Sequence, residues 1–314
     1  MKNTYHIYSK LLTLIFIITL SNAFGQDMKI AELENVSLEF YDSQEDKTPL
    51  VFIHGDSRDG SQYDNFISNF KESNRIITYS RRGYGNSTAS NDKKGIDTDV
   101  EDLLKLMTFL KIDKAAFIGN SYAGYIMTYL AENHPEKNIG QIYLAGNPGF
   151  NFKHILEKDS LDSYKMMFWA QGGKDYANNT AESLTSYQPE YITKENEIPD
   201  IPALGFLNND NMRGIENMNM ILMFASEPDR IEYEEPKKFF KKVASDSNIK
   251  QQVEDYFVNT VKPLLIEDTE KWIKYFPSLQ IVNLDAPFVT GYEFERTPEL
   301  VIKPIKDFLI SIKK

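Results

Sequence analysis

Short apolar segments alternate with longer amphipathic segments along much of this chain. A short, unbroken apolar run is typical of a strand buried on both faces of a parallel sheet. Runs of this kind, some of them alternating with polar residues, predict strands at 36–41, 50–53, 75–79, 115–118, 142–145 and 279–284, and sheet character also between 202 and 225. Amphipathic or helix-forming runs predict helices at 97–110, 125–132 and 300–312.

Strands that alternate with helices at this spacing are typical of the α/β class with a doubly wound, mostly parallel sheet. From Asn151 the chain becomes polar and rich in Tyr and Asn, over a length that exceeds an ordinary loop. We therefore expect a helical cap at about 151–219, inserted into a core formed by 26–150 and about 220–314. In such a sheet, ligands bind at the carboxyl ends of the strands.

The first 25 residues have the features of a secretory signal peptide. Lys2 and Lys10 precede the apolar run 11–20, and Ala23-Phe24-Gly25 offers a small-x-small cleavage site. The apolar run is short for a membrane span. We expect this segment to be removed and the mature protein to be exported, periplasmic or secreted, with no stable membrane insertion after cleavage.

Composition narrows the classes of partner. The chain of 314 residues has no cysteine, which excludes disulfides and thiolate metal sites. Loss of the leader takes Lys+Arg from 35 to 33 and leaves Asp+Glu at 46, so the mature net charge is 33 − 46 = −13. Such a surface repels nucleic acid and anionic membranes. We expect a small-molecule substrate or ligand, no cofactor and no metal.

The segment 117–124 joins the end of an apolar strand to a turn of small residues with one serine at its tip. Gly119 and Ala123 lie two positions on either side of Ser121, where a sharp strand-to-helix turn admits only small side chains. A helix-forming run follows the turn. This pattern indicates a nucleophile elbow and makes Ser121 the candidate nucleophile.

On four features the chain resembles the α/β-hydrolase superfamily, in its branch of capped serine esterases, iminopeptidases and carbon–carbon bond hydrolases. They are the His54-Gly55 turn after an early strand, the loop Arg82-Gly-Tyr-Gly-Asn-Ser87, the Gly-x-Ser-x-small elbow and Thr297-Pro298-Glu299 at the start of the closing helix. The resemblance runs from about Val36 to the C-terminus and implies the α/β-hydrolase fold.

The resemblance also implies an oxyanion hole made of the backbone N–H groups of Asp56 and Tyr122. The carboxylate of Asp56 would oppose an oxyanion unless it points away or is paired with a cation such as Arg58. The alternative interpretation of Asp56 is a solvated loop residue.

In this family an acidic residue follows a late strand and a histidine follows the last strand. Asp229, after an apolar run at 220–225, fits the acid position, and Asp210 is the rival candidate. The run before Asp229 could equally be a buried helix. By register the histidine position is occupied by Gly291 or Tyr292, and neither is a base near neutral pH.

The four histidines have other expected places. His6 leaves with the signal peptide, His54 supports the oxyanion loop in relatives, and His134 suits a helix C-terminus. His154, at the entrance of the cap, is the one that could reach Ser121. No histidine follows it in the sequence.

Two functions remain open. The first is an exported serine hydrolase that cleaves a small ester or amide slowly through Ser121, with protons handled by His154, Asp56, a glutamate such as Glu293, or water. Loss of one triad member typically leaves about 10³–10⁴-fold catalysis over water. The second is an inactive pseudo-hydrolase that binds a small molecule or a partner protein. Serine at the elbow excludes the epoxide hydrolase and dehalogenase types, which carry aspartate there.

Overall fold

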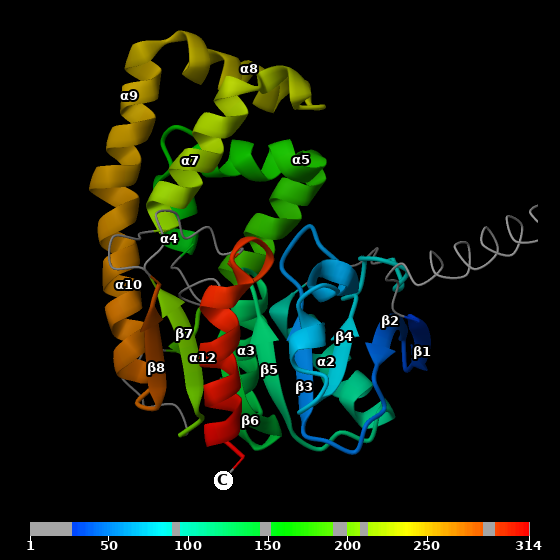
Figure 1. The fold of residues 1–314 in the computed structure, drawn as a ribbon. Helices are drawn as coiled ribbons and strands as arrows, with labels where there is room; N and C mark the ends of the chain where they lie inside the picture. Colours follow the sequence, from blue (N-terminus) through cyan, green and yellow to red (C-terminus); the bar gives the residue numbers. More distant parts are fainter. Residues whose placement is uncertain are drawn as a thin grey trace, which may run out of the picture.

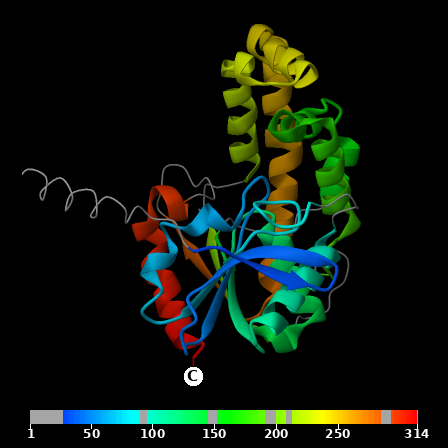
Figure 2. The same cartoon turned by 90° about the vertical axis from the view of Figure 1, so that its right-hand side faces the viewer.

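The computed structural model describes residues 27–89, 95–144, 152–190, 200–207, 213–284 and 293–313. In these residues an eight-stranded sheet is covered by helices on both faces, and further helices lie beyond one end of its strands (Figures 1 and 2). The predicted α/β class, with a mostly parallel sheet and helical cap, is confirmed.

The order of strands in the sheet is β1-β2-β4-β3-β5-β6-β7-β8. The strands are β1 Lys29–Leu33, β2 Val36–Asp42, β3 Pro49–Ile53, β4 Arg75–Tyr79, β5 Ala115–Gly119, β6 Asn138–Tyr143, β7 Ala203–Leu207 and β8 Leu279–Asn283. The hairpin of β1 and β2 joins the sheet antiparallel, and all pairs from β4 to β8 are parallel. The carboxyl ends of the parallel strands therefore meet at one edge.

Alternate side chains of the central strands enter two different hydrophobic clusters, because successive residues of a strand point to opposite faces. In β5, Ala115 and Phe117 lie in one cluster while Ala116 and Ile118 lie in the other, and all four are fully buried. An unbroken apolar run is what a strand in this position requires, as predicted.

Helices cover both faces of the sheet. The α-helices are α2 Ile96–Phe109, α3 Ala123–Asn133, α4 Phe152–Lys158, α5 Ser163–Ser186, α7 Arg213–Ser226, α8 Glu234–Ser245, α9 Ser247–Tyr256, α10 Lys262–Tyr275, α11 Glu293–Arg296 and α12 Pro298–Ser311. Five short helical turns join them, namely η1 Gly60–Tyr63, η2 Ile67–Asn69, η3 Pro135–Lys137, η4 Pro228–Arg230 and the π-helix η5 Phe257–Val261. Side chains of α2, α3 and α10 pack on one face, and those of η1, η2 and α12 on the other.

The cap is built from two separate stretches of chain (Figure 1). Helices α4 and α5 follow β6, whereas α7, α8 and α9 follow β7. The expected boundaries are therefore corrected in two ways. Strand β7 belongs to the sheet although it lies inside the range 151–219, and α7 to α9 form cap although they lie inside the range 220–314.

One long helical rod connects the cap to the core. Helices α9, η5 and α10 follow one another from Ser247 to Tyr275, with the π turn just before Pro263. A proline inside an α-helix would clash with the carbonyl four residues earlier, here that of Asn259 in η5. The wider π turn is the local adjustment to that proline. In the described part of the chain, no helix is long and apolar enough to cross a membrane.

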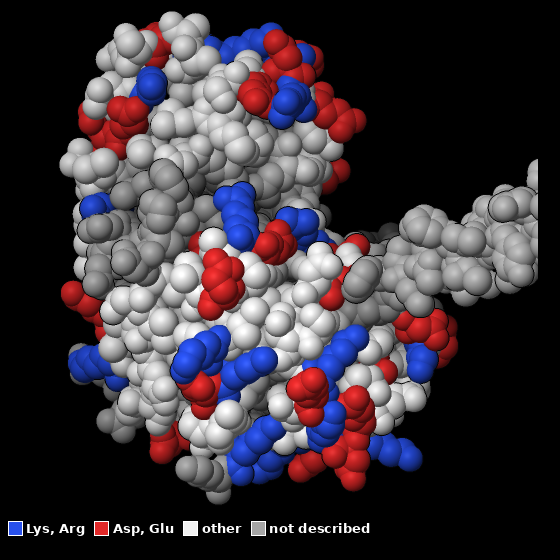
Figure 3. All heavy atoms as spheres, in the orientation of Figure 1, with Lys and Arg blue, Asp and Glu red and all other residues white. Residues whose placement is uncertain are grey.

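Charged side chains are mixed in sign over the face shown in Figure 3. Basic and acidic side chains alternate over α12 and the neighbouring core, and pairs such as Lys303 and Asp307 contact each other directly. Such exposed pairs contribute little to stability. This face carries no continuous basic patch among the described residues.

The assignment of β7 to the sheet can be tested at Gly205. A Cβ atom there would lie 2.7 Å from the indole ring of Trp272, a fully buried side chain of α10. We expect Gly205→Ala to lower the free energy of unfolding by about 1–3 kcal/mol through overpacking, measured by urea denaturation. Trp272→Phe shortens the opposing ring, so the double variant should lose less than the two single losses added together. Strict additivity would show that the two positions are not in contact.

Candidate active site

Ser121 occupies a strained turn between β5 and α3. Its φ angle is 54°, in the left-handed region that costs a residue other than glycine about 1–2 kcal/mol. The turn is tight, because a Cβ atom on Gly119 would come within 2.7 Å of the Cβ of Ala123. The predicted elbow conformation is present, and the Ser121 side chain is exposed at the carboxyl edge of the sheet.

The turn after β3 lies beside the elbow. A Cβ atom on Gly55 would be 3.5 Å from the Cβ of Ser121, so the backbone of this turn approaches the serine closely. Tyr122 precedes the first residue of α3, where backbone N–H groups have no partner within the helix. Among the described residues, neither the N–H of Tyr122 nor that of Asp56 donates to a backbone carbonyl. Both remain candidate oxyanion donors.

His54 holds the turn after β3 in place. The backbone N–H of Arg81 donates to its Nε2 at 2.9 Å, so the neutral ring carries its proton on Nδ1. That proton faces the carbonyl oxygen of Gly55 at 2.7 Å. The ring is fully buried, and both nitrogens are engaged in supporting the loop, as expected for this residue. His54 is therefore not a base for Ser121.

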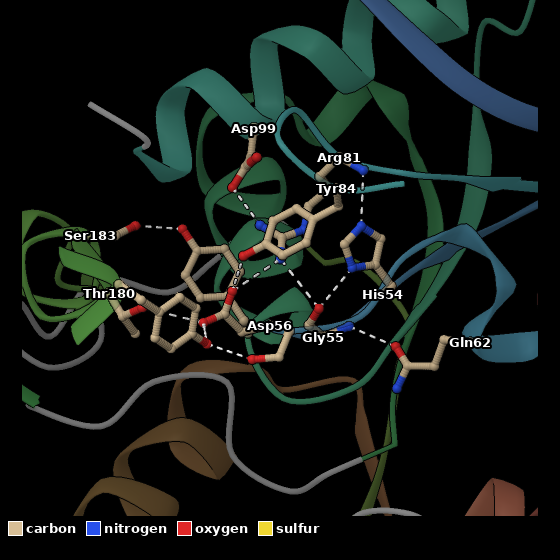
Figure 4. A network of polar contacts seen from close by, with 12 residues as sticks. His54, Gly55, Asp56, Gln62, Arg81, Tyr84, Asp99, Thr180 and Ser183 are labelled. Carbon is tan, nitrogen blue, oxygen red and sulfur yellow. Dashed lines mark hydrogen bonds and ion pairs between the residues drawn. The ribbon is translucent and has the colours of Figure 1, made fainter. Parts of the chain in front are cut away.

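The carboxylate of Asp56 lies in a polar network, shown in Figure 4. The hydroxyls of Tyr84 and Tyr176 donate to its two oxygens, and Thr180 lies 3.4 Å away. The guanidinium of Arg81 lies 3.7 Å from the same carboxylate. Its charge is thus shared among two phenols and one cation, and Asp56 is more than a solvated loop residue.

The cation beside Asp56 differs from the one suggested by the sequence. Arg58 follows Asp56 by two positions, but its guanidinium lies 3.9 Å from Glu295. Arg81, from the loop after β4, takes the place beside Asp56 instead. Adjacency in the sequence was a poor guide here because the cation reaches the carboxylate from a neighbouring strand.

Arg81 is buried at the centre of this network, with 2% of its surface exposed. Its Nη1 donates to Asp99 of α2 at 3.0 Å. Its guanidinium lies over two aromatic rings, 4.7 Å from the centroid of Tyr84 and 4.6 Å from that of Tyr122. An arginine can make these contacts together because its planar group stacks and donates in a fork.

Burial keeps the phenols of the network protonated. It is the main cause that raises the pKa of Tyr84, Tyr122 and Tyr176, and the nearby Asp56 carboxylate raises these pKa values further. Burial also raises the pKa of Asp99, against the opposing effect of Arg81. The hydroxyls of Tyr84 and Tyr176 therefore act as hydrogen-bond donors to the Asp56 carboxylate throughout the neutral range, and that of Tyr122 stays available to Ser183.

One face of the cap helix α5 contacts both parts of the site. Tyr176, Thr180 and Ser183 follow each other at spacings of four and three, which places them on the same helical face. Tyr176 and Thr180 reach Asp56, and the hydroxyl of Ser183 lies 2.5 Å from that of Tyr122. Sequence reasoning missed this face, although the spacing of its hydroxyl groups was visible.

The predicted acid, Asp229, lies elsewhere in the molecule. The run 220–225 belongs to α7, so the expectation that Asp229 follows a strand is wrong. Asp229 is exposed in η4 and lies 3.0 Å from Lys241 and 3.6 Å from Lys237. The hydrogen bond from Lys241 is the main cause that lowers the pKa of Asp229. A short, methionine-rich run fits a helix as well as a strand, which explains the error.

The rival acid, Asp210, comes three positions after the end of β7. A residue just beyond a strand of the parallel sheet is where the family resemblance requires the acid. Asp210 lies outside the described residues, as do Gly291 and Tyr292 at the expected histidine position. These three assignments stay predictions. The adjoining Thr297 precedes α12, which begins at Pro298 as expected.

Of the other two histidines of the described chain, one follows a helix and one lies on a helix. His134 follows the last residue of α3, the end farthest from Ser121, and its Nδ1 lies 3.9 Å from Glu136. His154 lies on α4, within electrostatic range of Glu267 on α10, whose pKa is lowered mainly by the hydrogen bond from Lys271. Within the described part of the chain, no group of three or more His, Asp or Glu side chains could hold a metal ion.

Comparison with known proteins agrees with this architecture. A family model described as alpha/beta hydrolase fold matches residues 48–184. The sn-1-specific diacylglycerol lipase of Danio rerio is 25% identical over 181 residues, 57% of this chain and 56% of that protein. The 2-hydroxymuconate semialdehyde hydrolase of Pseudomonas sp. (strain CF600) is 28% identical over 124 residues, 38% of this chain and 44% of that one. The chain thus spans about half the length of the curated relatives it matches.

A solved structure of similar fold is a hydrolase from Pseudomonas aeruginosa PA01, with a TM-score of 0.58. The match covers 90% of this chain and 98% of that one, at 13% identity. At this identity the similarity concerns the fold alone.

The strain at Ser121 generates a stability prediction. Glycine adopts a positive φ without the cost that serine bears, so Ser121→Gly should relieve the turn. We expect Ser121→Gly to raise the free energy of unfolding by about 1 kcal/mol over Ser121→Ala, measured by urea denaturation. The alanine variant is the matched control because it also lacks the hydroxyl. Equal stabilities would mean that the turn is not strained in solution.

The contact between cap and turn generates a second prediction. Tyr176→Phe removes a donor from the Asp56 carboxylate, and we expect a loss of about 1.5–3 kcal/mol, the usual size for a hydrogen bond to a charged group. Hydrogen exchange of the Gly55 to Ser57 amides should also speed up. Tyr187→Phe is the control, since Tyr187 follows the last residue of α5 and donates a similar bond to Glu132 on α3. Faster exchange in both variants would contradict a specific link to the turn.

Proposed function

The chain is a member of the α/β-hydrolase superfamily, and on this premise we propose that it is a serine-hydrolase homologue with a degenerate triad. In this proposal Ser121 keeps the pose of a nucleophile and lacks the imidazole that would accept its proton. The observation that carries the proposal is the exposed Ser121, held at a positive φ beside two backbone donors that have no carbonyl partner among the described residues. Such a protein would cleave a small ester or amide slowly.

The proposed reaction begins with attack of Ser121 Oγ on the carbonyl carbon of the substrate. The N–H groups of Asp56 and Tyr122 would donate to the oxyanion that forms, and such fixed dipoles usually give the largest gain in acyl transfer. The alcohol or amine then leaves with a proton, and water releases the acyl group from the serine. In the absence of a histidine, the serine proton passes to water or to a carboxylate such as Glu293.

The missing histidine is a proposal that rests on the sequence. No histidine follows His154, so the segment 285–292 contains none. His54 uses both ring nitrogens in the loop, and His134 lies at the opposite end of α3.

The alternative function is a catalytically inactive pseudo-hydrolase that binds a small molecule or a partner protein. The engagement of both His54 nitrogens favours it, because the imidazole on the turn after β3 is then unable to take a proton from Ser121. Small residues at positions 119 and 123 serve the turn whether or not Ser121 reacts. The names of the lipase and semialdehyde hydrolase relatives support a carbonyl compound as the ligand class in either case.

We also propose that residues 1–25 direct export and are removed, which would make the protein periplasmic or secreted. The support is the order of positive residues, apolar run and small residues in the sequence. Sequencing the N-terminus of the protein recovered from its native host would test this, with Gln26 expected as the first residue.

A covalent probe separates the two functions. We expect a fluorophosphonate to label Ser121 slowly in the wild-type protein and not at all in Ser121→Ala, as detected by intact-mass spectrometry. Gly291→His or Tyr292→His should raise the hydrolysis of p-nitrophenyl butyrate by about 10²–10⁴-fold, the usual contribution of a general base.

Glu295→His is the matched control, since it adds an imidazole at an exposed position of α11. A wild-type protein that resists the probe, together with no gain in either histidine variant, would establish the binding function instead.

A further inference from the structure

We propose that Arg81 is a positioning residue that fixes both oxyanion donors at once. The inference rests on the proposed function, because it concerns the same two N–H groups. Arg81 does not contact Ser121 in the described contacts and is not a catalytic residue. Its role follows from what its guanidinium touches on three sides.

The first contact orients the peptide between Gly55 and Asp56. Nη2 of Arg81 donates to the Gly55 carbonyl at 3.3 Å, beside the bond from His54. No peptide bond among the described residues is cis, so the C=O and N–H of this peptide point in opposite directions. Holding the carbonyl on the Arg81 side therefore turns the Asp56 N–H away from it, where a ligand can receive it.

The second contact concerns the other donor. The Tyr122 ring stacks on the Arg81 guanidinium, with 4.6 Å between the guanidinium carbon and the ring centroid. The Tyr122 hydroxyl is fixed at its far end by Ser183 of α5. The ring is therefore held on one face by Arg81 and at its hydroxyl by Ser183. These two contacts restrict the start of α3 and the orientation of the Tyr122 N–H.

The third contact is electrostatic. Asp56 places a carboxylate next to a backbone donor that is proposed to hold a negative charge. Arg81 lies 3.7 Å from this carboxylate, while Tyr84 and Tyr176 donate to it. A buried cation in that place offsets the negative potential of Asp56 at the oxyanion position.

The adjacent arginine shows what a purely structural role looks like. Arg82 also pairs with an aspartate of α2, donating to the two oxygens of Asp102 at 2.9 and 2.8 Å. Both arginines therefore attach the same loop to the same helix. Arg81 in addition donates to the carbonyl of Gly55 in the turn after β3, which makes Arg82 a matched control.

The test compares Arg81→Met with Arg82→Met in the full-length mature protein, using two readouts. The first is the rate of Ser121 labelling by a fluorophosphonate. The second is the shift of the Asp56 amide resonance during titration with sodium butyrate, a carboxylate that needs only N–H donors to bind. We expect Arg81→Met to label about 10²-fold more slowly, the effect of losing one oxyanion donor, and to lose the butyrate shift. Arg82→Met should match the wild type in both readouts.

Two further variants keep the test interpretable if Arg81→Met does not fold. Arg81→Met combined with Asp99→Asn removes both members of the buried pair, so Asp99 is not left as an unpaired charge, while Asp56 keeps its donors Tyr84 and Tyr176. Arg81→Lys keeps the charge but loses the planar fork. We expect both to fold and to show the same losses, whereas full recovery in the lysine variant would overturn positioning in favour of charge alone.

The outcomes separate this inference from the proposed function. A wild-type protein that resists labelling, but whose butyrate shift depends on Arg81, would overturn the hydrolase proposal and support the positioning role. Labelling that is equally fast in Arg81→Met and Arg82→Met would overturn the positioning role and leave the hydrolase proposal standing. A wild-type protein that responds to neither probe would overturn both, because the two N–H groups would then form no anion site.

Discussion

The parallel pairing of β3 with β5 is the constraint on which the site depends. Ile53 lies opposite Gly119 at the end of this pairing, so the segments that follow β3 and β5 leave the sheet at the same level. One continues into the turn at Gly55 and the other into Ser121. A shift of one residue would turn every side chain of a strand to the other face of the sheet. The two hydrophobic clusters therefore fix the distance between serine and turn.

A buried polar network lies above this pairing and connects it to the cap. Arg81 and Asp99 both lose their contact with water when they form this ion pair. A buried pair of this kind often adds little net stability, because the cost of desolvation offsets the attraction. The pair instead fixes the positions of the two side chains, because a charged group that loses its partner in the interior is poorly solvated and costly. Helix α5 completes the network through Tyr176. The position of the cap and the shape of the turn after β3 therefore depend on each other.

The sequence predicted the sheet well where burial leaves a simple signature. The apolar run 115–118 became β5, and the amphipathic run 97–110 became α2 with boundaries shifted by one residue. Prediction failed at 220–225, where a short apolar run is compatible with either period and tertiary packing selected the helix. Strand β1, with its exposed ends, had too weak a pattern to be noticed.

The candidate site was predictable only in part. Small residues around Ser121 reveal the elbow because the steric demand is local. The partner of Asp56 was not predictable, since Arg81 reaches it across neighbouring strands and depends on the completed fold. The same holds for Tyr176, which lies more than a hundred positions away along the chain but donates to the Asp56 carboxylate.

The insertion between β7 and β8 affects how the sheet can be completed during folding. Residues 208–278 separate two strands that must pair in register. Long-range parallel pairing is slow, because the entropy of loop closure is lost before the strands make any stabilising contact. The described helices in this interval form mostly local contacts, with α7 against α8 and α8 against α9. Local assembly shortens the effective loop, whose closure entropy grows only slowly with length. The cap helices between β7 and β8 thus also assist the pairing of β8 with β7 during folding.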